Sequence, residues 1–300
     1  MQRLAAVDIG SNTIHALVCD IVNGRLQEVA HEVAMPSLGT AVAKTGEIGK
    51  AKTAEAIADL KSVLNQASRH DYQHLVAGAT EAVRQARDRD AFLARAAAET
   101  GVPVRLITSE REAQLSFQGV ASAHASGGEW LMGDMGGGST ELVRAKNRDM
   151  LAWVSLPVGS GMLASRYLAD PPQSDERDQL RRDAAQTLAG GAPVFRPERL
   201  VMTGGTASNL PLVLDSRDPA VKLSVADIAE ARLRLDAEPA AQLAGELGLP
   251  ASRVIALRAG VEVLLLLLDR YQLEHLYVSH EGVRHGMLLA YLERGEDWWR

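Results

Sequence analysis

Two segments of this chain repeat one pattern: an apolar strand, an aspartate at its end, a turn of glycine and serine, and a second apolar strand. The aspartates of the two copies are Asp8 and Asp134, which lie 134 − 8 = 126 positions apart in a chain of 300 residues. That spacing indicates a duplicated domain, because it is a large part of half the chain. The repeat also predicts that an anionic ligand is held between the two copies.

Each of these turns has the chemistry of a phosphate-binding loop. Glycines let backbone N–H groups approach an anion and permit positive φ, and successive amides form a concave surface of donors. An aspartate beside a phosphate implies an intervening Mg²⁺ ion or its bound water. One such turn alone is more typical of an ordinary hairpin, but two copies favour phosphate binding. The predicted phosphate-binding residues are Gly10, Ser11, Asn12 and Thr13 in the first turn and Gly136, Gly137, Gly138 and Ser139 in the second.

The composition favours a soluble globular protein and argues against several other classes. A content of 46% hydrophobic and 23% charged residues is ordinary for a soluble globular protein, and 300 residues suffice for two domains. The net charge of −6 argues against a general nucleic-acid-binding protein. Cys19 is the only cysteine, which excludes an intrachain disulfide and favours a reducing cytoplasm. We expect no signal peptide and no membrane partner, because a strand-like run begins at once and the apolar run 263–268 is too short to span a bilayer.

Both halves are predicted to start with three strands and to continue with alternating helices and strands, which indicates an α/β fold with a mixed sheet in each half. The predicted strands are 3–9, 13–20, 25–33, 74–77 and 103–107 in the first half, and 129–135, 139–145, 150–156, 199–202 and 275–278 in the second. The main predicted helices are 53–68, 88–100, one from about 110, 252–270 and one that closes the chain. Small polar residues at 121–128 predict domains 1–124 and 125–300, with the last helix free to pack back on the first domain.

In their order and spacing, the motifs of this chain resemble the exopolyphosphatase/guanosine pentaphosphate phosphatase family, within the actin–hexokinase–Hsp70 superfamily. The resemblance covers nearly the whole chain and rests on the two turns and on the segments 79–84, 107–113, 203–207 and 279–284. It implies duplicated RNase H-like (actin-like ATPase) domains, each with a mixed five-stranded sheet and helices. It further implies an active site in the interdomain cleft.

The acidic residues at the turns are assigned to Mg²⁺ by this resemblance. Asp134 and Glu141 flank the glycine turn seven positions apart, so the two arms of one hairpin can present both carboxylates to one ion. The resemblance adds Asp8, facing them from the other half. For Glu141 the alternative is an exposed strand residue paired with an arginine. His15, which alternates with apolar neighbours, is interpreted as a core histidine.

The resemblance places the general base at Glu112, the Glu before Ala in Ile-x-x-x-x-Glu-Ala. The sequence itself offers an alternative, because Ser109 to Glu112 fits a helix capping box. Members of the family commonly carry an acidic residue where Arg111 stands, so the resemblance does not fix the charge near the base or its pKa. The segment 37–41 matches the family's Arg-Leu-Gly-x-Gly only in part.

Two further motifs follow predicted strands. Arg84 is the arginine of Thr-x-Ala-x-Arg that the resemblance directs at phosphate, and a helix-surface ion pair is the alternative. A second motif ends one strand and starts a helix, so its amides meet the positive end of a helix dipole. The residues of this second predicted phosphate-binding motif are Gly204, Gly205 and Thr206.

The predicted reaction is Mg²⁺-assisted hydrolysis of the terminal phosphoanhydride of inorganic polyphosphate, which releases orthophosphate. The alternatives are a 5′-phosphatase that converts guanosine pentaphosphate to tetraphosphate, an ATP-dependent kinase of the superfamily, and a non-catalytic sensor of polyphosphate or alarmone. The expected partner is thus inorganic polyphosphate or guanosine pentaphosphate, and a homodimer is left open.

Overall fold

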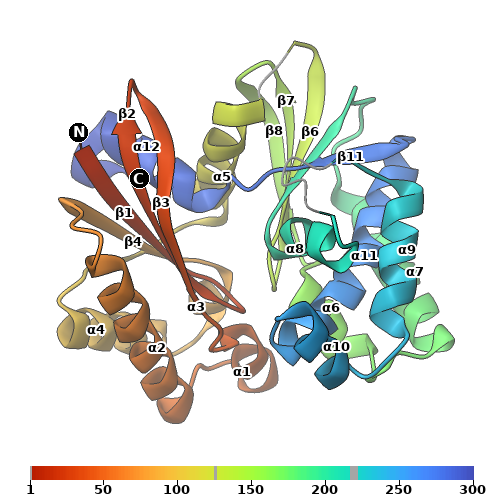
Figure 1. The fold of residues 1–300 in the computed structure, drawn as a ribbon, viewed down its shortest axis with the longest axis horizontal. Coiled ribbons are helices and arrows are strands. Elements are labelled where there is room, and N and C mark those ends of the chain that lie inside the picture. The colour runs from red at the N-terminus through yellow and green to blue at the C-terminus, as the bar shows by residue number, and fades with distance from the viewer. Residues whose placement is uncertain (1, 125–126, 217–221) are drawn as a thin grey trace. The chain divides into compact units, whose positions relative to one another are not determined.

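The computed structural model describes residues 2–124, 127–216 and 222–300 (Figure 1). The chain divides into two compact units, each built on its own sheet. Unit 1 comprises Met1–Gly119 and Glu281–Arg300, and unit 2 comprises Val120–His280. The C-terminal helix therefore belongs to the same unit as the first strand.

Unit 1 contains a five-stranded mixed sheet whose first three strands are antiparallel and whose last two run parallel to the first. In spatial order the strands are β3 (Arg25–Ala34), β2 (Ile14–Val22), β1 (Gln2–Ile9), β4 (His74–Ala79) and β5 (Val104–Leu106). The helices are α1 (Leu38–Thr45), α2 (Lys50–Ser68), α3 (Glu81–Gln85), α4 (Arg89–Thr100), α5 (Ser109–His124, which runs on into unit 2), α12 (Val283–Arg294) and a 3₁₀ turn (Gly295–Asp297).

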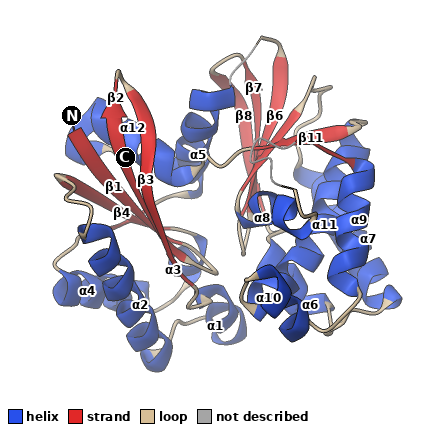
Figure 2. Ribbon diagram, viewed as in Figure 1, coloured by secondary structure: helices blue, strands red, loops and turns tan. Residues whose placement is uncertain are grey.

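The sheet of unit 1 has helices on both faces because β1 is apolar on both faces (Figure 2). Ala5 and Val7 are buried in one cluster with residues of α2 and α4, whereas Leu4 and Ala6 are buried in another with residues of α12. A strand covered on both faces has a nearly continuous apolar sequence, as residues 4–7 do. The second face of this N-terminal strand is covered by a helix from the other end of the chain.

Unit 2 repeats this arrangement. Its first three strands are antiparallel, and the next two run parallel to the first. In spatial order the strands are β10 (Lys222–Ser224), β11 (His275–Val278), β9 (Leu200–Thr203), β6 (Glu129–Met135), β7 (Thr140–Lys146) and β8 (Asp149–Leu156). The helices are α6 (Ser160–Tyr167), α7 (Ser174–Gly191), α8 (Gly205–Val213), α9 (Val225–Asp236), α10 (Ala240–Leu247) and α11 (Ala251–Tyr271).

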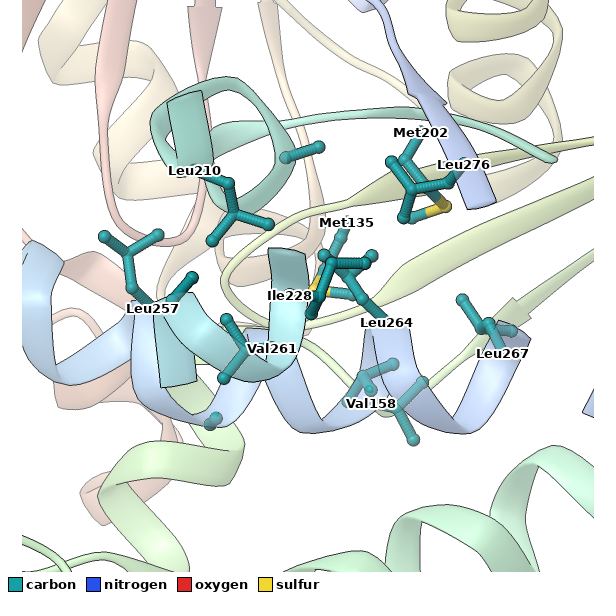
Figure 3. Packing of buried hydrophobic residues seen from close by; sticks show 14 of the residues in the cluster. Met135, Val158, Met202, Leu210, Ile228, Leu257, Val261, Leu264, Leu267 and Leu276 are labelled. Carbon is teal, nitrogen blue, oxygen red and sulfur yellow. The ribbon is translucent and has the colours of Figure 1, made fainter. Parts of the chain in front are cut away.

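The core of unit 2 is centred on α11. Leu257, Val261 and Leu264 follow the spacing of one helix face and lie with Met135 and Met202 of the sheet (Figure 3). The apolar run of this helix is therefore explained by burial within a globular core. Among the helices of the described residues, none has both the length and the hydropathy of a membrane span.

The predicted α/β class and the two mixed sheets are confirmed. The prediction of five strands in each sheet is correct for unit 1, but the sheet of unit 2 has a sixth strand, β10, which pairs antiparallel with β11. With three residues, β10 is too short to show an alternating pattern, and its pairing with β11 defines it.

Candidate active site

The two glycine turns have the same hydrogen bond at equivalent positions. In the first turn the amide of Gly10 donates to the carbonyl of Thr13 at 2.9 Å, and in the second the amide of Gly136 donates to the carbonyl of Ser139 at 3.0 Å. The offsets are 136 − 10 = 126 and 139 − 13 = 126, the same as between the two aspartates. The repeat in the sequence is thus a repeat of backbone structure.

The first turn is held by the loop that leads into α1. The amide of Ser37 donates to the carbonyl of Asn12 at 3.1 Å, and the amide of Gly39 donates to the carbonyl of Ser11 at 2.7 Å. Ser37 adopts a left-handed conformation with φ 55°, which turns the chain from β3 into the helix. The segment that matches the family motif only in part therefore still supports the turn.

The second turn is held by the start of α6 in the same manner. The amide of Ser160 donates to the carbonyl of Gly136 at 3.0 Å, and the amide of Met162 donates to the carbonyl of Gly137 at 2.8 Å. The carbonyl oxygens of both turns already accept hydrogen bonds from the following helix. The backbone amides are therefore the groups that each turn could offer to an anion. Both turns are thus braced by the helix that follows the third strand of their unit.

Gly159 is a site residue that the sequence analysis missed. A Cβ atom at this position would lie 2.3 Å from the carbonyl carbon of Gly138 and 2.5 Å from the amide of Ser139, so only glycine lets α6 approach the turn. The sequence signal was a proline and glycine cluster directly after the third strand of each half, at 36–39 and 157–161.

Asp134 and Glu141 face each other across β6 and β7 as direct partners, which puts their side chains on one face of the sheet. Glu141 is only 2% exposed, and its Oε1 accepts hydrogen bonds from Ser139 at 2.9 Å and from Ser155 at 2.6 Å. Glu141 is therefore not an exposed strand residue.

This carboxylate pair fits a Mg²⁺ ion. Magnesium is bound in proteins by one or two carboxylates together with substrate phosphates and water, and it needs no larger cage of side chains. In the described ranges no three His, Cys, Asp or Glu side chains are grouped to hold a metal, so the site would depend on phosphate oxygens.

The hairpin of unit 1 differs in charge from that of unit 2. Asp8 faces His15 across β1 and β2, so His15 occupies the place that Glu141 has in the other copy. His15 Nδ1 lies 3.0 Å from Nε2 of His31, and the two rings stack with centroids 5.2 Å apart. His15 is half-buried, and its interpretation as a core histidine is wrong.

Glu112 lies in the first turn of α5 and is bonded to an arginine. Its Oε2 accepts a hydrogen bond from Nη1 of Arg84 at 3.0 Å, and the Glu112 side chain is 13% exposed. The hydroxyl of Thr108 accepts the amide of Arg111 at 3.1 Å, so the cap of this helix is one residue earlier than the predicted capping box. Glu112 is therefore positioned by a cation, in addition to its place in the helix.

Arg84 has a second carboxylate partner, Glu81, which lies one helical turn before it on α3. Nη1 of Arg84 also donates to the carbonyl of Ile107 at 2.6 Å. Burial by itself lowers the pKa of the Arg84 guanidinium, but the Glu112 and Glu81 carboxylates outweigh it and hold this pKa above its ordinary value. Arg84 therefore stays a cation between two acids.

Arg111, which stands where the family has an acid, bonds to the C-terminal turn. Its guanidinium donates to the carbonyl of Trp298 at 3.0 Å from Nε and to Oε1 of Gln114 at 3.1 Å. Burial lowers the pKa of Arg111. Its side chain thus holds the C-terminus against α5.

The motif after β9 meets the hairpin of unit 2, because Thr203 is the strand partner of Asp134. Gly204 has φ +92°, and a Cβ there would lie 2.3 Å from the carbonyl oxygen of Met135. The side chain of Thr206 is buried, and a Cβ at Gly260 of α11 would lie 2.3 Å from its Oγ1. The Thr206 hydroxyl is therefore turned into the core, which leaves its backbone amide for a ligand.

Arg253 on α11 is a second residue that the sequence analysis missed. A Cβ at Gly205 would lie 2.2 Å from its Nη1, so the guanidinium covers the start of α8. Burial lowers the pKa of Arg253, and no carboxylate of the described residues forms an ion pair with it. A buried cation beside helix N-terminal amides is suited to an anion. No local pattern around residue 253 marks it.

Comparison with known proteins gives the same family as the motifs. Residues 17–295 match the model of the Ppx/GppA phosphatase family. Exopolyphosphatase 2 of Mycobacterium tuberculosis is 29% identical over 97% of this chain and 98% of its own length. Exopolyphosphatase 1 of the same organism is 33% identical over 61% of this chain, and the match spans only about half (54%) of that relative.

Solved structures of this family have the same fold. The Ppx/GppA family member of Aquifex aeolicus is 27% identical, with a TM-score of 0.81 over 98% of this chain and 99% of the other. An exopolyphosphatase of Cytophaga hutchinsonii is 25% identical, with a TM-score of 0.88 over 97% of this chain and 98% of the other.

Proposed function

Because the chain belongs to the Ppx/GppA phosphatase family, we propose that it is an exopolyphosphatase, which hydrolyses the terminal phosphoanhydride of inorganic polyphosphate and releases orthophosphate. The observation that carries this proposal is the match to exopolyphosphatase 2 of M. tuberculosis, which extends over nearly the full length of both chains. The two braced glycine turns, the carboxylate pair and the Arg84–Glu112 pair support it chemically.

In the proposed mechanism, backbone amides of both turns and of the Gly204–Thr206 motif bind phosphate oxygens. The hydroxyl of Ser139 donates to Glu141, so this serine contributes its amide to the phosphate. Phosphoryl transfer depends mainly on positioning and on charge stabilisation, and such amides supply both.

Asp134 and Glu141 would hold Mg²⁺, and Asp8 is proposed as a further ligand on the family resemblance alone. The bound ion would neutralise charge on the phosphate oxygens. The serine hydroxyls that bond to Glu141 keep its carboxylate oriented toward the side of the sheet that carries Asp134.

Glu112 would accept the proton of the attacking water. A carboxylate bonded to a guanidinium is held in one orientation, which a base requires. In this arrangement Arg84 acts on the water-activating group, whereas the sequence analysis directed it at phosphate.

The test is an assay of orthophosphate release by the purified chain with Mg²⁺, on polyphosphates of defined length and on guanosine pentaphosphate. We expect release from polyphosphate, loss of release with EDTA, and a rate about 10²–10⁴-fold lower for Glu112→Gln. Glu110→Gln, an exposed glutamate of the same helical turn, is the matched control and should keep the rate.

Two outcomes of this assay would replace the proposal. Faster release from guanosine pentaphosphate than from any polyphosphate would identify the 5′-phosphatase alternative. Binding of polyphosphate without release of orthophosphate would identify a sensor, in which Glu112→Gln changes nothing that the assay measures.

A further inference from the structure

We propose that Glu81 is a positioning residue for hydrolysis: it holds Arg84 in the orientation in which the Arg84 guanidinium fixes the Glu112 carboxylate. This inference rests on the proposed function, in which Glu112 activates water. Glu81 is not among the residues that the motif analysis assigned to the site.

The donors of Arg84 are almost fully used. Nε donates to Oε2 of Glu81 at 3.1 Å, and Nη2 donates to the same oxygen. Nη1 donates to the carbonyl of Ile107 at 2.6 Å and to Oε2 of Glu112 at 3.0 Å. A guanidinium has five N–H donors, so about one remains for any other ligand. Arg84 as it stands is a bridge between two carboxylates.

Glu81 is itself fixed by the short helix that carries it. Its Oε1 accepts a hydrogen bond from Nε2 of Gln85, and Arg84 bonds to its other oxygen. Residues three and four positions apart on a helix lie on one face, so the single turn of α3 presents Glu81, Arg84 and Gln85 together. Arg84 is therefore held from its own helix before it reaches Glu112 on another.

The partial burial of these side chains strengthens the ion pairs of Arg84 with Glu81 and Glu112. The side chains of Arg84, Glu81 and Glu112 are 17%, 19% and 13% exposed, whereas fully exposed ion pairs contribute little. Charge-assisted bonds in such surroundings are short and directional. Without the charge at Glu81, the guanidinium can turn about its side-chain torsions, and Glu112 loses its fixed partner.

The experiment compares Glu81→Gln with wild type on tripolyphosphate at saturating Mg²⁺. Glutamine keeps the shape of the side chain and removes its charge. We expect kcat to fall about tenfold while KM changes less than about twofold, because a small misplacement of a reacting group costs rate. Glu81→Asp keeps the charge and should retain more of kcat than Glu81→Gln.

A double variant separates positioning from a general structural effect. In the Glu112→Gln background, the further change Glu81→Gln should cost almost nothing, because residues that act as one unit give non-additive losses. The matched control is Glu47→Gln, since Glu47 bonds Nε and Nη2 of Arg87 at 3.3 and 3.2 Å on the surface of the same unit. This control should keep the kcat and KM of wild type.

Three kinetic results would overturn the inference: an unchanged kcat and KM in Glu81→Gln, a loss that is additive with Glu112→Gln, or a lower KM with unchanged kcat. The last would mean that Glu81 restrains a phosphate-binding Arg84. If the wild-type chain releases no orthophosphate, the proposed function fails, and the inference is tested instead by the Nε–H signal of Arg84 in ¹⁵N-detected NMR.

That signal, identified by its absence in Arg84→Lys, should be sharp in wild type and broadened in Glu81→Gln. An unchanged signal would overturn it.

Discussion

Gly204 shows how one residue allows a binding motif to form. The strand before it pairs with β6 up to Asp134, and the chain then turns into α8 directly over the carbonyl of Met135. This turn needs both a positive φ and the absence of a Cβ atom. The same requirement does not hold for Gly245 in α10, where a Cβ would meet no atom within 4 Å.

We therefore expect Gly204→Ala to lower the free energy of unfolding by about 2 kcal/mol or more, from the strained φ and the clash with a backbone oxygen. Gly245→Ala, within a helix, should raise it by about 0.5–1 kcal/mol. Urea denaturation followed by circular dichroism measures both. Equal effects of the two changes would show that the backbone at Gly204 relaxes freely.

The helices α1 and α6 are short, and each begins against a glycine turn. Their first amides donate to carbonyls of the turn, so each helix braces a hairpin formed by the strands before it. In unit 2 the two backbones approach so closely that Gly159 has no room for a side chain. The braced structure thus comprises three strands and a helix start, in addition to the turn.

If this brace shapes the binding loop, Gly159→Ala should weaken phosphate binding. The added methyl group must push α6 from Gly138 and Ser139, and a displacement of about 1 Å can cost on the order of 10²-fold in rate. We expect kcat/KM on polyphosphate to fall about 10- to 100-fold. Gly190→Ala in α7, where a Cβ meets no atom within 4 Å, is the control. A wild-type kcat/KM for Gly159→Ala would contradict the role of the brace.

Buried charges link the helices of unit 2 and make the stability of the molecule depend on pH. Glu262 on α11 is fully buried and accepts hydrogen bonds from Arg177 at 2.8 Å and Arg181 at 2.5 Å. Asp236 also pairs with Arg177. Burial raises the pKa of Asp236 to about 6, against the opposing attraction of Arg177 and Arg258. The folded protein therefore favours the protonated carboxyl of Asp236 more than the unfolded chain does.

The sign of the resulting pH dependence is defined. A carboxyl with a raised pKa in the folded state stabilises the fold fully below its unfolded pKa, near 4, and loses this contribution as the pH rises through about 6. Between pH 4 and pH 7, wild type should therefore lose about 1–2 kcal/mol of stability relative to Asp236→Asn. Urea midpoints across this range measure the difference. Asp215→Asn, at an exposed aspartate, should show no such trend. A wild type that keeps or gains stability relative to Asp236→Asn as the pH rises from 4 to 7 would refute the assignment.

Most of the fold could be predicted because its signals are local. Apart from β10, the strands of both halves follow from strand-like runs of four to nine residues in the sequence, and the equal offset of Asp8, Gly10 and Thr13 from Asp134, Gly136 and Ser139 marks the duplication. The family and the mixed sheets were predicted from such patterns and are confirmed. The short strand β10 was missed because three residues show no periodicity.

The candidate site was predictable only where its parts are adjacent in the chain. The turns, Asp134 with Glu141, and Gly204 with Gly205 are each encoded within a few residues. Their proposed roles toward Mg²⁺ and phosphate stay predictions. For Gly159 the proline and glycine cluster at 157–161 marks only a turn and does not say which backbone it meets, and no local pattern marks Arg253.

Turn chemistry and apolar periodicity are properties of neighbouring residues, and they suffice to specify two copies of a strand–turn–strand element followed by alternating helices and strands. The partners of a charged side chain are a property of space. Arg84 bonds to Glu81 three positions away and to Glu112 twenty-eight positions away, and Arg111 bonds to the C-terminal turn. Those pairings arise when the sheet and its helices bring distant segments within hydrogen-bond distance. Tertiary packing, and not the local sequence, therefore determines which carboxylate or carbonyl each arginine contacts.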